Sequence, residues 1–84
     1  AYVGINRDPK FKTEIHENLL EIPEIDRIIE VTGRFDLMVG ALAEDLEQLH
    51  SIVVDKIGKI DGIQNTETFV ELERTEKSPT YLSS

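Results

Sequence analysis

The residue types best suited to recognising a small charged molecule stand together in the run Thr32-Gly33-Arg34-Phe35-Asp36. They combine a hydroxyl group, a glycine whose backbone a ligand can approach closely, and a carboxylate at the start of an apolar segment. Backbone N–H groups and the Asp36 carboxylate could together hold the carboxylate and ammonium groups of a zwitterion. The alternative, from the residue types alone, is an ordinary β-turn that carries polar side chains.

Residues that could support catalysis or bind a metal are sparse. Cysteine is absent, and the only two histidines, His16 and His50, fall within predicted helices, where we expect them at the exposed surface. No His or acidic spacing typical of a metal site is present. The alternating carboxylates Glu67, Glu71 and Glu73 are typical of a solvated or edge strand. The glycines form no phosphate-binding motif. We therefore expect no catalytic residue, no metal and no cofactor.

The first part of the chain predicts a strand followed by a helix. Residues 1–6 suit a short strand. Asp8 followed by Pro9 is typical of a helix start, because the carboxylate caps free backbone N–H groups and proline fits the first turn. We expect the helix to end near Pro23. Its apolar stripe recurs every three or four residues, at Phe11, Ile15, Leu19 and Ile22.

The middle of the chain predicts a hairpin and a second amphipathic helix. Residues 25–31 and 35–42 have the β-branched and apolar character of two strands, joined by a turn at residues 32–34. Asp45 and Gln48 have the spacing of a helix capping box. The apolar stripe of the helix that follows comprises Leu46, Leu49, Val53, Ile57 and Ile60.

Two equivalent βαβ halves account for this order of elements. The pair Asp61-Gly62 ends the second helix, and residues 66–73 alternate as a last strand should. A shift of 38 positions superimposes the apolar stripe of the first helix on that of the second, and a strand follows each helix. We therefore predict an α+β, ferredoxin-like βαββαβ fold, in which right-handed crossovers place both helices on one face of a four-stranded antiparallel sheet.

Both faces of this predicted sheet carry apolar residues. Strand alternation assigns to the helix side Val3, Ile5, Phe35, Leu37, Val39 and Ala41. Further apolar residues outside that set are Tyr2, Ile28, Met38, Leu42, Val70 and Leu72. A register error of one residue would exchange the two faces. A second apolar face needs a cover, and the simplest cover is the same face of another subunit, so we predict a dimer through the open face.

Composition restricts the class of protein. The 84 residues suit one domain, which we expect at residues 1–74 with a tail at residues 75–84 that is mobile or docked on a neighbouring subunit. The net charge of −8 disfavours direct binding of nucleic acid or anionic membranes. The absence of cysteine, of a long apolar run and of a signal-peptide pattern predicts a cytoplasmic location.

Three motifs occur in order along the chain: EVTGRFDLMV from Glu30, EDLEQL from Glu44 and IDGIQNTET from Ile60. They resemble the central hairpin, the start of the second helix and the entry to the last strand in the C-terminal effector-binding (RAM) domain of the Lrp/AsnC transcriptional regulators. The resemblance extends over residues 1–72. It implies a domain that dimerises through its sheet, assembles further into octameric discs, and binds amino acids between dimers to modulate transcription.

The resemblance also implies an effector site. Its expected lining is Thr32, Gly33, Arg34 and Asp36 of one subunit, with Thr66, Thr68, Phe69 and Val70 from the last strand of a neighbour. Arg34 stands where the family often has an acidic residue, which favours a ligand with an acidic or amide side chain. Asp61 stands where the family usually has a proline, directly before Gly62. No helix-turn-helix precedes Ala1, which indicates a stand-alone version of the module or a fragment.

Three functions remain open from the sequence. The first is an amino-acid sensor without DNA-binding capacity, which acts by self-assembly or by co-assembly with full-length Lrp/AsnC regulators. The second is a structural oligomerisation domain that binds no ligand. The third is a small enzyme of the dimeric α+β barrel type, in which facing sheets enclose the active site. The expected helix positions of His16 and His50 argue against this third function.

Overall fold

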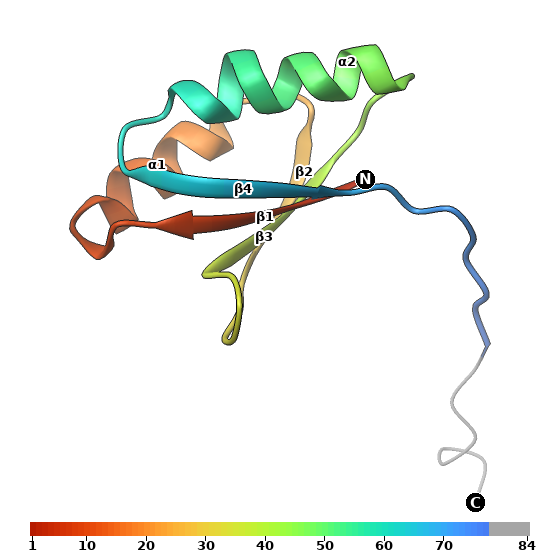
Figure 1. Ribbon diagram of the computed structural model, residues 1–84, viewed down its shortest axis with the longest axis horizontal. Coiled ribbons are helices and arrows are strands. Elements are labelled where there is room, and N and C mark those ends of the chain that lie inside the picture. The colour runs from red at the N-terminus through yellow and green to blue at the C-terminus, as the bar shows by residue number, and fades with distance from the viewer. Residues whose placement is uncertain (78–84) are drawn as a thin grey trace, which may run out of the picture.

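Four strands form one antiparallel sheet in the computed structural model of the chain, which describes residues 1–77. The sheet order is β2-β3-β1-β4. The strands are β1 (Tyr2–Arg7), β2 (Ile25–Glu30), β3 (Leu37–Ala41) and β4 (Ile63–Phe69). Both helices lie on the same side of this sheet (Figure 1). The ferredoxin-like fold predicted from the sequence is therefore confirmed.

The first helical segment begins at the predicted start, Asp8 followed by Pro9. The Asp8 side chain accepts a hydrogen bond of 3.0 Å from the backbone N–H of Lys10, and proline opens the short 3-10 turn Pro9–Phe11. The turn leads directly into α1 (Lys12–Leu20). Ile15 and Leu19 of this helix, both predicted in its apolar stripe, are completely buried against the sheet.

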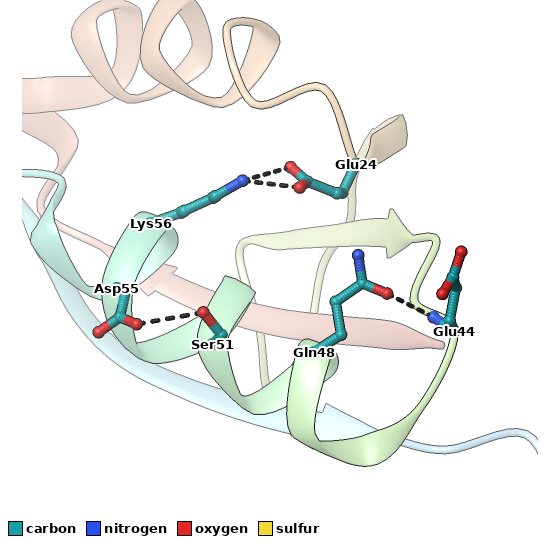
Figure 2. Close-up of polar contacts among 6 residues, drawn as sticks. All are labelled: Glu24, Glu44, Gln48, Ser51, Asp55 and Lys56. Carbon is teal, nitrogen blue, oxygen red and sulfur yellow. Dashed lines mark hydrogen bonds and ion pairs between the residues drawn. The ribbon is translucent and has the colours of Figure 1, made fainter.

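The second helix begins with the predicted cap. The Asp45 carboxylate accepts a hydrogen bond of 2.7 Å from the backbone N–H of Gln48 in α2 (Leu46–Ser51). The Gln48 side chain returns to accept a hydrogen bond of 2.6 Å from the backbone N–H of Glu44 (Figure 2). These two contacts satisfy backbone donors that a helix end otherwise leaves unpaired.

Beyond its first turns this helix departs from α geometry. It continues as the π-helical turn Ile52–Lys56 and the 3-10 turn Ile57–Lys59. A π turn holds an extra residue, so it changes which side chains face the sheet. The buried residues are Leu49, Ile52 and Ile57. The predicted stripe was therefore wrong at Leu46, which is exposed, and it omitted Ile52, which is buried. Val53 and Ile60 are half-buried and pack against the core, as predicted.

A bidentate ion pair ties the π-helical turn to the start of β2. Lys56 Nζ lies 2.7 Å and 2.6 Å from the two carboxylate oxygens of Glu24, while Ser51 Oγ lies 3.1 Å from Asp55 Oδ2 within the helix (Figure 2). The hydrogen bond from Lys56 holds the pKa of the Glu24 carboxyl below its usual value. The contact joins two segments that lie 32 positions apart in the sequence.

The core lies between the helices and one face of the sheet. The strand residues buried there include Val3, Ile5, Leu37, Val39 and Ala41, all of which were predicted on the helix side. Phe35 was also placed on this side, and that prediction was wrong, because its ring lies against Gly4 on the opposite face. Phe35 precedes the first residue of β3, so strand alternation does not determine its direction.

We refer to the sheet face opposite α1 and α2 as the open face. By pairing and alternation it carries Tyr2, Gly4, Asn6, Arg27, Ile29, Met38, Gly40, Asn65, Glu67 and Phe69. Ile28 was grouped outside the helix-side set, but it packs against the core. The pairing of β2 with β3 is irregular between Ile25 and Arg27, which shifts the alternation by one residue. The open face is thus mixed rather than uniformly apolar.

The last strand lies earlier than predicted. It was expected at residues 66–73, but it begins at Ile63 and ends at Phe69. The pairing ends there because Phe69 is opposite Tyr2, the first residue of β1. Residues 70–77 are exposed, have no regular secondary structure and lead away from the sheet (Figure 1). Most of the predicted tail, residues 78–84, lies outside the described residues.

Candidate ligand-binding site

The predicted turn connects β2 to β3 on the side of the sheet away from the helices (Figure 1). It closes with a hydrogen bond of 3.0 Å from the backbone N–H of Val31 to the carbonyl oxygen of Asp36. Gly33 has a φ of 107°, a conformation that side chains with a Cβ rarely adopt. Glycine is therefore required at this position by the backbone, whether or not a ligand approaches it.

The turn is fastened to β1 by three hydrogen bonds. The backbone N–H of Asp36 donates to the carbonyl oxygen of Ile5 at 3.0 Å, and the Asn6 side chain donates to the carbonyl oxygen of Arg34 at 2.8 Å. The Asp36 Oδ2 atom accepts a hydrogen bond of 2.9 Å from the backbone N–H of Arg7. One oxygen of the candidate ligand-binding carboxylate is thus engaged within the chain, which gives Asp36 a structural role.

The turn also reaches β4 across the open face. The ring of Phe35 covers Gly4 and packs edge-to-face against Phe69, with ring centroids 5.9 Å apart. Beside it, Arg34 Nη2 lies 3.2 Å from Glu67 Oε2, and the Arg34 guanidinium lies 5.6 Å from the centre of the Phe35 ring. The structure therefore brings Arg34 and Phe69 of the predicted site together within one subunit.

The other predicted residues of β4 lie elsewhere. Thr66 pairs with Ile5 and Thr68 with Val3, both of which are buried under the helices, so the two threonines face the helix side. Thr68 and Val70 line a hollow of about 240 Å³ beside α2. Within one subunit, the predicted site residues are therefore divided between the two faces of the sheet.

Glu67 is the contact residue that the sequence prediction missed. It lies between Thr66 and Thr68, and strand alternation turns it to the open face, where it meets Arg34. The opposite charges of Arg34 and Glu67 were a usable signal, but only once the register of β4 against β1 was known.

The hairpin turn presents a surface rather than an enclosed pocket. Thr32, Gly33 and Arg34 are exposed, whereas Asp36 is half-buried. Five hollows on the described surface are lined by other residues, without any contribution from these four. An enclosed ligand site at this turn therefore requires a second surface placed against it.

Two further properties concern residues 1–77 alone. Within them, no three His, Asp or Glu side chains come together in a way that could hold a metal ion. Nor does any helix in this range have the length and apolar character needed to span a membrane.

The fold and the hairpin define a small α+β domain of the ferredoxin-like type. The model of the Lrp/AsnC ligand-binding domain matches residues 1–81, and the chain belongs to this family. The resemblance inferred from the three sequence motifs is confirmed. The chain is therefore a regulatory ligand-binding domain related to the Lrp/AsnC regulators.

Individual relatives agree with this assignment. An HTH-type transcriptional regulator of Pyrococcus abyssi is 34% identical over 70 residues, which cover 83% of this chain and 44% of the relative. The chain thus spans about half the length of the curated relatives it matches.

Two solved structures share the fold at lower identity. Escherichia coli AsnC has a TM-score of 0.85 and 23% identity, with 93% of this chain and 53% of that chain covered. The transcriptional regulator NMB0573 from Neisseria meningitidis, solved as a complex with L-methionine, has a TM-score of 0.76 and 16% identity. The match covers 98% of this chain and 56% of that one.

Proposed function

We propose that this domain senses an amino acid and that ligand binding changes its self-assembly, which in turn modulates transcription. Membership of the Lrp/AsnC ligand-binding family and the methionine complex of NMB0573 support this proposal. At a net charge of −8, the domain acts through assembly rather than through direct contact with DNA. Its proposed location is the cytoplasm, and it has no catalytic role, since His16 and His50 are exposed on helices.

The observation that carries the proposal is the packing of Phe35 against Phe69. This contact makes the hairpin turn and the open face one continuous surface. A ligand that reorients the turn must therefore alter the face that a second subunit would cover. Because ligand binding and subunit association would then share the same residues, each would change the affinity of the other.

The open face is the proposed dimer interface. Ile29 and Phe69 are 42% and 40% exposed, and Met38 and Tyr2 lie beside them on the same face. Aromatic and methionine side chains are favoured at the centres of protein interfaces. We extend the proposal to the association of dimers into an octamer and to co-assembly with full-length Lrp/AsnC regulators through the same face.

The proposed effector site combines residues of two subunits. Backbone N–H groups at Thr32 and Gly33 would receive the ligand carboxylate, and the Asp36 carboxylate would receive its ammonium group. Arg34 would contact the side chain of the ligand. A neighbouring subunit would supply the remaining predicted residues, which are Thr66, Thr68, Phe69 and Val70. Its contribution accounts for the open shape of the turn in a single chain.

Calorimetry with each of the standard amino acids, combined with sedimentation velocity in the presence and absence of every binder, tests this function. We expect at least one amino acid to release or absorb heat and to change the sedimentation coefficient. If no amino acid gives heat and none changes sedimentation, the sensor function is wrong and a structural oligomerisation domain remains.

The interface is tested separately by a charge placed on the open face. Phe69→Glu should convert the dimer to a monomer, because a buried unpaired carboxylate at an interface is strongly unfavourable. Leu20→Glu is the matched control, since Leu20 is 65% exposed on α1, away from the open face. Equal sedimentation of the two variants would place the interface elsewhere.

A further inference from the structure

Three consecutive residues of β1 hold the hairpin turn, and the middle one, Asn6, does so through its side chain. The Ile5 carbonyl accepts the N–H of Asp36, and the N–H of Arg7 donates to the Asp36 carboxylate. Both contacts use backbone atoms of β1, so they do not depend on the β1 side chains. The Asn6 side chain donates to the carbonyl oxygen of Arg34 at 2.8 Å. Of the three contacts, only this one requires a particular residue type on β1.

The Asn6 contact fixes the direction of a peptide group within the turn. The peptide bond between Arg34 and Phe35 is trans and planar, so its C=O and N–H point in opposite directions. With the Arg34 oxygen held toward Asn6, the N–H of Phe35 points away from Asn6. The backbone N–H groups of residues 32–35 donate to no acceptor within residues 1–77. Successive free N–H groups in a turn can form an anion-binding concavity.

Asn65 determines which end of the Asn6 amide faces the turn. Asn65 lies opposite Asn6 in the pairing of β1 with β4, and its side-chain NH₂ group donates to Asn6 Oδ1 at 3.3 Å. An asparagine amide has one acceptor end and one donor end. Because Asn65 engages the acceptor end, the donor end of Asn6 is left to face the Arg34 carbonyl. We call these two hydrogen bonds, from Asn65 through Asn6 to Arg34, the asparagine relay.

The relay differs from the other contacts between β4 and the turn. Glu67 reaches the guanidinium of Arg34, and Phe69 reaches the ring of Phe35, so both act on side chains of the turn. The path that begins at Asn65 ends instead on the main chain of the turn. A polar pair that served only the sheet would end on β1 or β4. The relay therefore acts on the same backbone whose N–H groups would receive a ligand carboxylate.

We propose that Asn6 and Asn65 are positioning residues of the effector site. Asn65 orients the Asn6 amide, and Asn6 holds the Arg34 carbonyl inward, so the free N–H groups of the turn are arranged before an amino acid binds. Such preorganisation raises affinity, because the turn does not have to be ordered on binding. The inference rests on the proposed amino-acid function and adds two residues that were absent from the expected lining. Neither residue has to touch the ligand.

The first test uses variants that replace an amide with a carboxylate of the same size. Asn65→Asp removes the donor that orients Asn6, and Asn6→Asp removes the donor to Arg34. Gln64→Glu is the matched control, since it makes the same change of charge at a neighbouring exposed residue of β4 that is outside the relay. In NMR spectra of the chain without ligand, the chemical shift of the Arg34 carbonyl carbon should change in both asparagine variants and not in the control. An unchanged Arg34 shift in both asparagine variants would overturn the relay.

The second test measures affinity by calorimetry with each of the standard amino acids, at a temperature where every variant is folded. Asn6→Asp and Asn65→Asp should each weaken binding about three- to tenfold, as expected when one hydrogen bond is lost, and Gln64→Glu should not. In the Asn6→Ala background, Asn65→Ala should cause no further loss of affinity, because Asn65 acts only through Asn6. If either carboxylate variant does not fold, the alanine variants replace it.

The outcomes separate this inference from the proposed function. Heat from the unmodified chain with equal affinity in the asparagine variants would overturn the positioning role and leave the sensor function standing. A further loss from Asn65→Ala in the Asn6→Ala background would also overturn it, since the two residues would then act independently. No heat from the unmodified chain with any amino acid would reject the sensor function, and the positioning role with it.

Discussion

The ring of Phe35 packs edge-to-face against Phe69, at an interplanar angle of 83°, and it does so directly above Gly4. A residue that precedes β3 is thereby joined to the last residue of β4, across the intervening strand β1. Only a glycine leaves space for this arrangement, because a Cβ atom at position 4 would lie 2.8 Å from atoms of the ring. The position of the hairpin turn therefore depends on a residue 31 positions away in the sequence.

Gly4→Ala should displace the Phe35 ring and destabilise the domain by about 1–3 kcal/mol, the usual cost of overpacking. Urea denaturation of both proteins measures this difference. In the double variant Gly4→Ala, Phe35→Leu the smaller side chain leaves space for the new methyl group. The combined loss should then be smaller than the sum of the two single losses. Additive losses would show that Gly4 and Phe35 act independently.

Asp36 has two roles that different substitutions separate. Asp36→Ala removes the acceptor for the Arg7 N–H and should reduce stability by about 1–3 kcal/mol. Asp36→Asn keeps an acceptor oxygen and should therefore retain most of the stability. If the carboxylate binds a ligand ammonium group, both variants should lose about 1–3 kcal/mol of amino-acid affinity by calorimetry. Full affinity in a folded Asp36→Asn variant would exclude recognition by charge at this residue.

The helix starts could be predicted because their signals are local. Asp8 before Pro9, and Asp45 three residues before Gln48, each form the expected cap within a single turn. The turn predicted at residues 32–34 is equally local, because Gly33 adopts its positive φ within the turn itself. The strand order followed from these elements, since right-handed connections leave few arrangements for two βαβ units.

The errors arose where distant contacts or irregular geometry decide the outcome. Phe35 faces Gly4 because of a long-range contact, and Ile28 faces the core because the pairing of β2 with β3 is irregular nearby. The predicted stripe omitted Ile52, which is buried together with Ile57 five positions further along, because the π-helical turn between them departs from regular helical spacing. The Glu67 contact likewise required the register of β4.

The ion pair between Glu24 and Lys56 should make stability depend on pH. The hydrogen bond from Lys56 lowers the pKa of Glu24 in the folded state, so the pair stabilises the fold at pH values above the ordinary pKa of a glutamate. This contribution is lost as the pH falls through the lowered pKa. Lys56→Met should therefore lower the urea midpoint at neutral pH and should leave it unchanged at an acidity below both pKa values.

Two measurements control this prediction. Lys59→Met changes an exposed lysine three positions away and should produce no pH-dependent difference. NMR titration of the Glu24 carboxyl should give a higher pKa in Lys56→Met than in the unmodified chain. A stability difference that stays constant across the pH range would mean that Lys56 contributes by packing and not by charge.

Arg34 should determine which amino acids bind at the hairpin turn. Its guanidinium is paired with Glu67 at 3.2 Å, and its side chain is 79% exposed, so it can exchange this partner for an acidic or amide group on a ligand. Glu67→Gln removes the competing carboxylate and should raise the affinity for aspartate and glutamate. Arg34→Gln should lower that affinity by about 1–3 kcal/mol, with little effect on neutral amino acids. Calorimetry with aspartate, glutamate, asparagine and leucine separates these effects. A uniform change for all four ligands would mean that Arg34 supports the turn and does not select the ligand.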